Sequence, residues 1–294
     1  MDKIIHIIGV PMDLGQSQRG VDMGPSALRY AGLFSKLHEL GYQIKDLGNI
    51  HIQDRETLNK DDLMTEICRV NELVYKAGQQ AISNKNLPIF LGGDHSISIG
   101  SIGGVTHDSS VGIIWIDAHC DYNTPETSLT GNIHGMALAT LMGKGWPELV
   151  NIGRPGPKIY SRDVVMIGVR SLDPAEKEII SRSGITIFTM RDIDVSGISQ
   201  IIHMALKHLS HQKNIHVSFD LDALEPVEAP GVGTPVRGGL TVREAHIIME
   251  IIADSQLLSS LDIVEINPIL DNYNRTALKA IELTESLFGK RILM

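Results

Sequence analysis

The chain has 294 residues, and its 35 Asp and Glu residues outnumber its 26 Lys and Arg residues, which gives a formal net charge of −9. This acidic balance argues against a basic scaffold that binds nucleic acid. At 43% hydrophobic and 21% charged residues, the composition is that of an ordinary globular protein, and a chain of this length buries most of its unfolded surface without disulfide staples.

The cysteines and the apolar runs bear on where the protein works. Cys68 and Cys120 are too few for the disulfide framework of a secreted protein, and Cys120 lies among acidic and His residues. No stretch approaches the roughly 20 apolar residues that a membrane helix needs. We therefore expect a cytoplasmic protein with no membrane partner.

Short runs rich in Ile and Val recur along the chain and predict strands. The candidates are residues 4–10, 42–47, 87–91, 111–116, 163–169, 185–188, 215–219 and 261–266. Most are apolar at consecutive rather than alternate positions, which is typical of strands that are covered on both faces. The pattern favours a parallel sheet.

Segments of helical length separate these strands, with apolar residues spaced by three and four. They are residues 26–40, 61–82, 174–183, 195–209, 242–252 and 275–288. Thr241 and Glu244 have capping-box spacing before one of them. The alternation predicts a three-layer α/β/α fold with a central, mostly eight-stranded parallel sheet. Because no repeat or linker interrupts it, we expect a single domain over residues 1–294.

Polar side chains follow the fourth predicted strand. Asp117, His119 and Asp121 lie at alternate positions, so in an extended segment they would point to one face. Carboxylates gathered away from water need a partner, and a metal ion is the simplest one. Cys120 would point away from that face and take no part.

Two other strands end in a similar way. Asp220 and Asp222 follow the seventh strand, and His95 follows the third strand after two glycines. Each signal has a plain alternative, namely a solvated turn for the aspartates and a surface His beside a helix cap for His95. In open parallel sheets, however, ligands bind beyond the carboxyl ends of the strands, where these side chains would meet.

Four carboxylates and two imidazoles suit two ions that share bridging carboxylates. An oxygen-rich site with a minority of His ligands favours Mn²⁺ over Zn²⁺. Two neighbouring ions lower the pKa of a shared water and orient it, which indicates hydrolysis. The chain contains no P-loop, no dinucleotide fingerprint and no Gly-x-Ser-x-Gly elbow.

Residues 92–96, 117–121 and 218–222 together resemble the three metal motifs of the ureohydrolase family, which includes arginases, agmatinases and formiminoglutamases. Their order and spacing match across nearly the whole chain. Residues 123–135 resemble the substrate loop of arginases rather than that of agmatinases. The resemblance implies the arginase activity, which is hydrolysis of the L-arginine guanidinium to L-ornithine and urea.

The resemblance also implies a ligand set for two Mn²⁺ ions. One ion would be held by His95, Asp117, Asp121 and Asp220, and the other by Asp117, His119, Asp220 and Asp222. Asp117 and Asp220 would bridge the ions. A hydroxide held between them would attack the guanidinium carbon, and Asp121 would hydrogen-bond it.

Other matched residues would handle the substrate. Glu265 would pair with the guanidinium, whose planar fork suits a carboxylate, although a structural salt bridge is the alternative. His134 would shuttle a proton to the leaving amine. The α-carboxylate would meet Asn123, Ser128 and Thr130, the α-amino group would meet Asp173 and Glu176, and Thr234 would lie near the guanidinium. Such polar residues are also common in loops for turn reasons alone.

The chain departs from the family pattern at three positions. Glu225 replaces an aspartate outside the ligand set, and Ser171 and Thr130 stand where well-known arginases carry Asp and Ser. A ureohydrolase that acts on agmatine or another guanidino compound is therefore the nearest rival. A non-catalytic regulator that binds metal or arginine is a second rival, and a two-metal phosphatase is a weaker one. The family further implies a homo-oligomer, either a trimer or a hexamer.

Nine histidines lie outside these motifs and are predicted to be structural. They are His6, His38, His51, His107, His203, His208, His211, His216 and His246. His216 shares strand parity with Asp220 but lies deeper in the predicted sheet, so we expect a hydrogen-bonded core residue.

Overall fold

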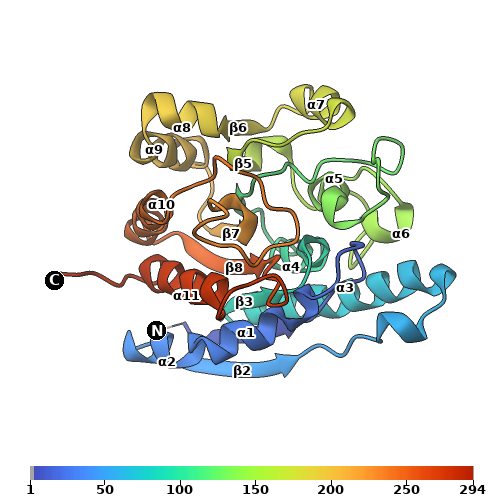
Figure 1. Cartoon of the computed structure of the whole chain (residues 1–294), viewed down its shortest axis with the longest axis horizontal. Coiled ribbons are helices and arrows are strands. Elements are labelled where there is room, and N and C mark those ends of the chain that lie inside the picture. Colours follow the sequence, from blue (N-terminus) through green and yellow to red (C-terminus); the bar gives the residue numbers. More distant parts are fainter. Residues whose placement is uncertain (1–2, 294) are drawn as a thin grey trace.

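The computed structural model of the chain describes residues 3–293, without the side chains of residues 60 and 61. Its centre is an eight-stranded sheet with the strand order β2-β1-β3-β8-β7-β4-β5-β6 (Figure 1). The strands are β1 Ile5–Val10, β2 Ile44–Asn49, β3 Leu87–Gly92, β4 Gly112–Ile116, β5 Val164–Val169, β6 Thr186–Thr189, β7 Ile215–Asp220 and β8 Leu258–Val264. All neighbouring pairs are parallel, which confirms the predicted sheet.

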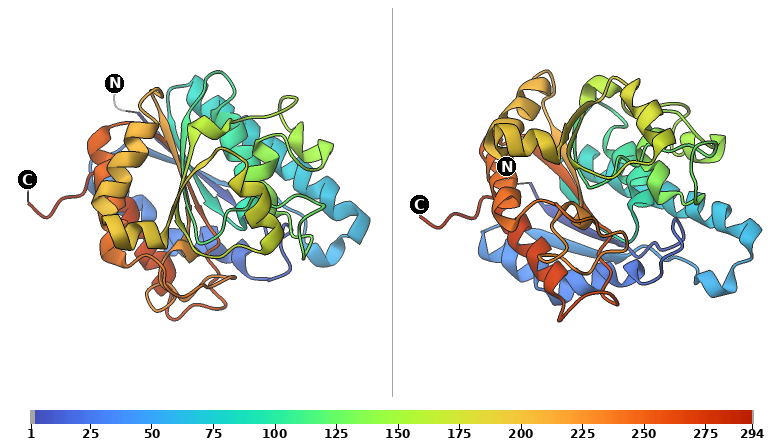
Figure 2. Two further views of the ribbon diagram at one scale, coloured as in Figure 1. Left: turned by 90° about the horizontal axis from the view of Figure 1, so that it is seen from above. Right: turned by 45° about the horizontal axis from the view of Figure 1, so that its top comes forward.

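Helices cover both faces of the sheet, and Figure 2 shows the sheet between the two layers. One layer holds α1 Gly24–Tyr30, α2 Leu33–Glu39, α8 Met190–Ser196, α9 Ile198–His208, α10 Val242–Ser255 and α11 Arg275–Leu287. The other holds α3 Lys60–Ser83, α4 Ser98–Val105, α5 Ala137–Leu141, α6 Pro147–Val150 and α7 Pro174–Ser181. The three-layer α/β/α prediction is confirmed.

Each face of the sheet has its own apolar core. In β4, Ile114 and Ile116 pack into the core beneath α9 to α11, whereas Ile113 and Trp115 pack into the core beneath α3 to α5. Successive residues of a strand face opposite sides, so both sets must be apolar when helices cover both faces. This is why the strands read as unbroken apolar runs.

Two predicted helices are each divided in the structure. Residues 26–40 form α1 and α2 with Gly32 at φ 95° between them, and residues 195–209 fall on α8 and α9, which meet at Gly197 with φ 80°. A positive φ costs glycine little and ends a helix. The capping box of Thr241 and Glu244 is confirmed at the start of α10. No helix within residues 3–293 has the length and apolar character to span a bilayer.

The strand order places the predicted site. β3, β8, β7 and β4 are successive neighbours in the sheet. Within three residues after their ends the chain carries His95, Glu265, Asp222 and Asp117, respectively. Because parallel strands end at the same edge, all these residues lie at one edge of the sheet.

Candidate active site

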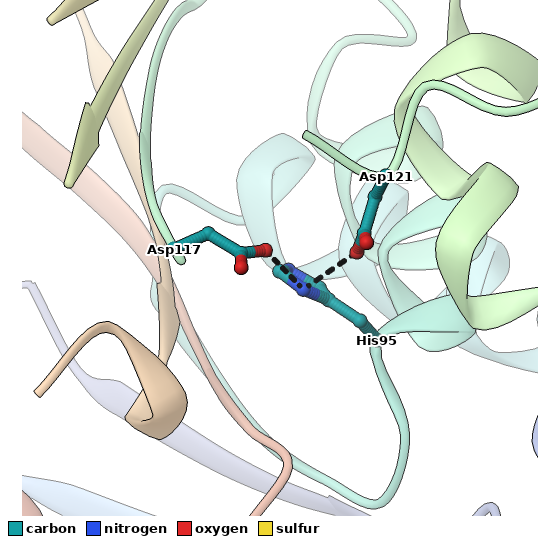
Figure 3. A group of neighbouring side chains, drawn as sticks. All are labelled: His95, Asp117 and Asp121. Atoms are coloured by element: carbon teal, nitrogen blue, oxygen red, sulfur yellow. Dashed lines mark ion pairs between the residues drawn. The ribbon is translucent and has the colours of Figure 1, made fainter. Parts of the chain in front are cut away.

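His95 lies at the centre of a group of carboxylates. Its Nδ1 atom is 3.2 Å from an oxygen of Asp117 and 3.1 Å from oxygens of Asp121 and Asp220. Figure 3 shows the Asp117 and Asp121 side chains converging on the imidazole from two sides. The ring also stacks on Trp115 at a centroid distance of 4.1 Å, which fixes its plane. Sequence positions 95, 117, 121 and 220 therefore meet at one point.

A second group lies beside the first and shares one member with it. His119 Nδ1 is 3.0 Å from Asp222 and 3.5 Å from Asp117. His95, Asp117 and Asp121 form one set of potential metal ligands, and Asp117, His119 and Asp222 form another. Asp117 thus stands between two candidate cation positions.

The local conformation that brings these residues together differs from the expected extended segment. β4 ends at Ile116, and Asp121 has the left-handed φ of 48°, so residues 117–121 form a turn rather than a continued strand. The backbone N–H of His119 donates to Asp117 Oδ1 at 2.7 Å, and that of Asp222 donates to Asp220 Oδ1 at 2.8 Å. Backbone N–H groups two residues further along the chain therefore fix the orientation of the Asp117 and Asp220 carboxylates.

Burial and charge shift the pKa values of the group in opposite directions. Burial raises the pKa of Asp121 to about 6, and the charge of Asp117 adds to this effect. For Asp117, burial also favours the protonated form, but the hydrogen bonds to His119 and His95 outweigh it and hold the pKa below the usual value. Burial disfavours a charged His119, yet the Asp222 and Asp117 charges raise its pKa to about 12. The raised values of Asp121 and His119 mean that, without a cation, the cluster takes up protons to offset its crowded carboxylates.

The donors fit a pair of divalent cations. His95 Nδ1 is completely buried and makes no hydrogen bond of acceptable geometry among the described residues, although three carboxylates surround it. One N–H could serve only one of those oxygens, whereas a cation can serve all of them together with the ring nitrogen. His95 Nε2 lies 2.8 Å from Ser218 Oγ, which suits a tautomer with Nδ1 free to bind metal.

Glu265 and His134 form an ion pair behind the two groups. Glu265 directly follows β8 with φ 63°, and its N–H donates to Gly93 O at 2.9 Å. His134 Nδ1 is 3.0 Å from Glu265 Oε1. Burial lowers the pKa of His134, but the charge of Glu265 outweighs it and raises the value to about 9. Burial likewise opposes charge on Glu265, and the His134 charge overcomes it so that the pKa falls below its usual value.

A pocket of about 220 Å³ opens over the carboxylates. Its lining residues are His119, Asp121, Asn123, His134, Gly135, Ser171, Asp173, Glu176, Asp220, Asp222 and Thr234. Asn123 Nδ2 donates to Asp173 Oδ2 at 2.9 Å, and Thr234 Oγ1 donates to Asp222 Oδ2 at 3.0 Å. Burial raises the pKa of Glu176 to about 8. Predicted metal ligands and predicted substrate contacts therefore share one cavity.

Ser128 and Thr130 do not line this pocket. Their hydroxyls accept hydrogen bonds from backbone N–H groups of their own loop, at Gly131 for Ser128 and at Asn132 for Thr130. Their predicted contact with the α-carboxylate stays a prediction. Glu225, the departure in the third motif, accepts from the N–H groups of Gly238 and Gly239 and so ties its own loop together.

Two residues that sequence reasoning missed contact this site. Gln16, in the loop after β1, donates to Glu265, and Arg170, after β5, donates to carbonyls that include those of Asp222 and Val236. Neither is a metal ligand type that would stand out in a motif. Their position soon after the end of a strand could have pointed to them, because ligands bind beyond the carboxyl ends of the strands in a parallel sheet. His216 is fully buried with Nδ1 2.8 Å from Ser260 Oγ, which confirms the prediction of a hydrogen-bonded core histidine.

The central strands of this all-parallel α/β/α sheet are followed by two groups of carboxylates and imidazoles that could hold metal ions. Residues 3–289 match the arginase family, and the chain belongs to this family. It is 48% identical to an arginase of Bacillus subtilis over the full length of both chains, and 49% identical to an arginase of Bacillus caldovelox over 99% of this chain and all of the relative.

Solved structures agree with these sequence matches. A structure of Bacillus caldovelox arginase superposes with a TM-score of 0.95 at 49% identity, and covers 99% of this chain and all of its own. Entamoeba histolytica arginase in complex with L-ornithine superposes with a TM-score of 0.87 at 31% identity, with coverage of 99% and 100%.

Proposed function

We propose that the protein is a manganese-dependent arginase that hydrolyses the guanidinium group of L-arginine to L-ornithine and urea. The observation that carries this proposal is the sharing of Asp117 between two ligand groups whose other members Asp121, His119 and Asp222 line one polar pocket. Membership of the arginase family supports the same activity. The two-ion ligand set and the substrate contacts below are part of the proposal.

His95, Asp117, Asp121 and Asp220 would hold one ion, and Asp117, His119, Asp220 and Asp222 would hold the other. Short distances from both imidazoles to the intervening carboxylates support this division. When bound, such a pair of cations lowers the pKa of water and orients it for attack. Mn²⁺ is the proposed metal because carboxylate oxygens outnumber imidazoles in the set.

Glu265 would accept the guanidinium N–H groups through its carboxylate, which the His134 charge keeps ionised. His134 would move a proton from Nδ1 or Nε2 to the departing amine, since its imidazole lies on the pocket wall. Asp121 faces the same cavity and would hold the attacking water through a carboxylate oxygen.

The opposite end of the substrate carries an α-carboxylate and an α-amino group. Asp173 and Glu176 line the pocket as acids and would meet the amino group, and Asn123 would meet the carboxylate together with Ser128 and Thr130. Thr234 lies beside Asp222 and would approach the guanidinium. Glu176 lies in the first turn of α7 and Asp173 is its N-cap, whereas the other side chains proposed to contact the substrate lie outside the helices and strands.

A urea assay on metal-stripped protein tests the proposal. The protein is repleted in turn with Mn²⁺, Co²⁺ and Zn²⁺, and urea release is compared for L-arginine and agmatine. We expect the highest rate with Mn²⁺ and L-arginine. A preference for agmatine would contradict the roles given to Asn123 and Thr130. If no guanidino compound is turned over, the result would favour a non-catalytic regulator that binds metal or arginine.

We also propose that the chain acts as a single domain, in the cytoplasm, as a homo-oligomer of three or six copies. The single sheet and the two cores attached to it support the first point. Sedimentation velocity on the purified protein would test the third, and a monomeric species at micromolar concentration would contradict it.

A further inference from the structure

We propose that Gln16 is a positioning residue that fixes the orientation of the Glu265 carboxylate and leaves it one free lone pair for the substrate. Gln16 Nε2 donates to Glu265 Oε2 at 2.8 Å, and only 2% of Gln16 is exposed. The two residues lie 249 positions apart in the chain. The inference rests on the proposed function, because it concerns how Glu265 meets a guanidinium.

A count of donors around Glu265 carries the argument. An ionised carboxylate offers about four lone-pair sites. Oε1 faces the N–H of His95 at 2.8 Å and Nδ1 of His134 at 3.0 Å, so both of its sites are used. Oε2 receives Gln16 Nε2, which leaves one site on that oxygen. The substrate guanidinium, which has only donors, would therefore meet Glu265 through Oε2.

The chemistry of the pair also settles which way the Gln16 amide points. Every contact around the carboxylate brings a nitrogen to it, namely the N–H of His95 and Nδ1 of His134 at Oε1 and Nε2 of Gln16 at Oε2, so Glu265 acts as the acceptor. Nε2 must then face Glu265, and Oε1 must face away from it. Oε1 lies beside Gly233, next to Thr234 of the pocket lining, where a Cβ on the glycine would come within 3.3 Å of it. Gln16 thus spans from the carboxylate to the pocket wall.

The loop that carries Gln16 is itself fixed. Arg55 Nη1 donates to the carbonyl oxygens of Gln16 and Asp13, at 2.5 and 2.9 Å. Gly15 donates its N–H to the buried Asp94 at 2.8 Å, and its carbonyl accepts the N–H of His134 at 3.1 Å. One loop therefore contacts Glu265, His134 and the turn before His95, so its geometry bears on both residues that are proposed to handle the guanidinium and the leaving amine.

Two substitutions separate positioning from space filling. Gln16→Met keeps the length of the side chain and removes the donor, whereas Gln16→Glu keeps the shape and sets a second carboxylate against Glu265. If Gln16 only fills space, the length-conserving Gln16→Met should stay near the wild type, and only the added charge of Gln16→Glu should cost activity. If it positions Glu265, Gln16→Met should lose activity and Gln16→Glu should lose more. Gln18→Met, in the same loop but exposed, is the matched control.

The readout compares L-arginine with L-ornithine on the manganese-loaded enzyme. We expect kcat/KM for L-arginine to fall about 10- to 100-fold in Gln16→Met, the range for one hydrogen bond to a charged group. L-Ornithine lacks a guanidinium, so it makes no guanidinium contact with Glu265 in either the wild type or Gln16→Met. Its inhibition constant should therefore stay within about threefold of the wild-type value. Gln16→Met within about twofold of the wild type, or a parallel loss of L-ornithine binding, would overturn the inference.

A crystal structure of Gln16→Met separates this inference from the proposed function. If the wild type releases no urea from L-arginine, the arginase proposal fails, yet the orientation of Glu265 can still be compared. A rotated Glu265 carboxylate in the variant supports positioning by Gln16. An unchanged Glu265 with its Oε2 in the same place contradicts it.

Discussion

The buried cluster of ligand-type residues and the loop of residues 123–132 near the pocket are built in different ways. We call His95, Asp117, Asp220, Asp222 and Glu265 the floor, and each is at most 3% exposed. The rim is the segment 123–132, where Thr130 is exposed and Ser128 is half-buried. Floor residues end central strands or lie within three residues after them. The rim is part of a loop in which Ser128 and Thr130 accept hydrogen bonds from backbone N–H groups of the same loop.

This difference separates the chemistry from the choice of substrate. Floor side chains are held by backbone N–H groups and by each other, so a change in one disturbs the whole cluster. Rim side chains are free to vary with little effect on the floor, because loops tolerate substitution better than the elements that carry them. Ser171 and Thr130, which depart from the family pattern, lie on the pocket wall and in the rim. All six predicted metal-ligand positions carry the Asp or His that the pattern requires.

The largest effect is expected from Asp117→Asn. Asp117 belongs to both ligand groups, and its two oxygens already accept from Trp115 Nε1 and from the N–H of His119. An amide would point a donor at one of these donors. Substitution of residues that only hydrogen-bond to a metal ligand typically lowers metal affinity or activity about 10- to 100-fold. Asp117 is itself a proposed ligand, so we expect urea release to fall by more than about 100-fold even at saturating Mn²⁺.

Urea assays and atomic absorption measurements of bound manganese check this expectation. Asp194→Asn, on an exposed position of α8, is the control and should keep wild-type activity. Wild-type turnover by a correctly folded Asp117→Asn protein would contradict the shared role of Asp117.

A large loss of stability is expected from Arg170→Met. The Arg170 guanidinium donates to the carbonyls of Asp222, Ala223, Leu224 and Val236, and so fastens the loop that carries Asp222. Met fills much of the same space but leaves these carbonyls without their donor. We expect the free energy of unfolding to fall by about 2–4 kcal/mol. Denaturant titration measures it, with the exposed Arg191→Met as control, and a loss below about 1 kcal/mol would mean that water replaces the guanidinium without penalty.

Thiol labelling tests whether the floor stays closed. Cys120 lies between His119 and Asp121 in the chain, is 0% exposed and has its pKa raised by burial. Burial raises the pKa of the half-buried Cys68 to about 11 from the usual value near 9. Raised thiol pKa values mean less thiolate, about 100-fold less for Cys68 at pH 8 than for an unperturbed thiol. We expect iodoacetamide to modify Cys68 slowly and Cys120 only after unfolding, as followed by peptide mass spectrometry. Early modification of Cys120 would show that the floor opens.

Much of the floor could be predicted from the sequence, because ligand types at the ends of apolar runs are a strong signal. Parallel strands must end at one edge, so His95, Asp117 and Asp220 were expected at that edge once their strands were recognised. The strand order that makes them neighbours is seen only in the structure. The left-handed conformation of Asp121 and Glu265 was not predictable, since nothing in their local sequence demands a positive φ.

The parts that escaped prediction depend on contacts between distant segments. Gln16 is an ordinary loop residue until the fold sets it against Glu265, and no local pattern marks that contact. For Ser128 and Thr130 the difficulty is different, because the same hydroxyl suits a loop turn and a substrate carboxylate.

The smallest effect is therefore expected from the rim, in Ser128→Ala and Thr130→Ala. Each removes a hydroxyl that now caps a backbone N–H of its own loop and that would meet the α-carboxylate. We expect kcat/KM for L-arginine to fall less than about tenfold, with the free energy of unfolding unchanged within about 0.5 kcal/mol. Turnover of agmatine, which lacks the α-carboxylate, should not change, and the exposed Ser199→Ala on α9 should leave both substrates unaffected. Equal losses for the two substrates would mean that these hydroxyls shape the loop and do not bind the α-carboxylate. The rim would then not determine the choice of substrate.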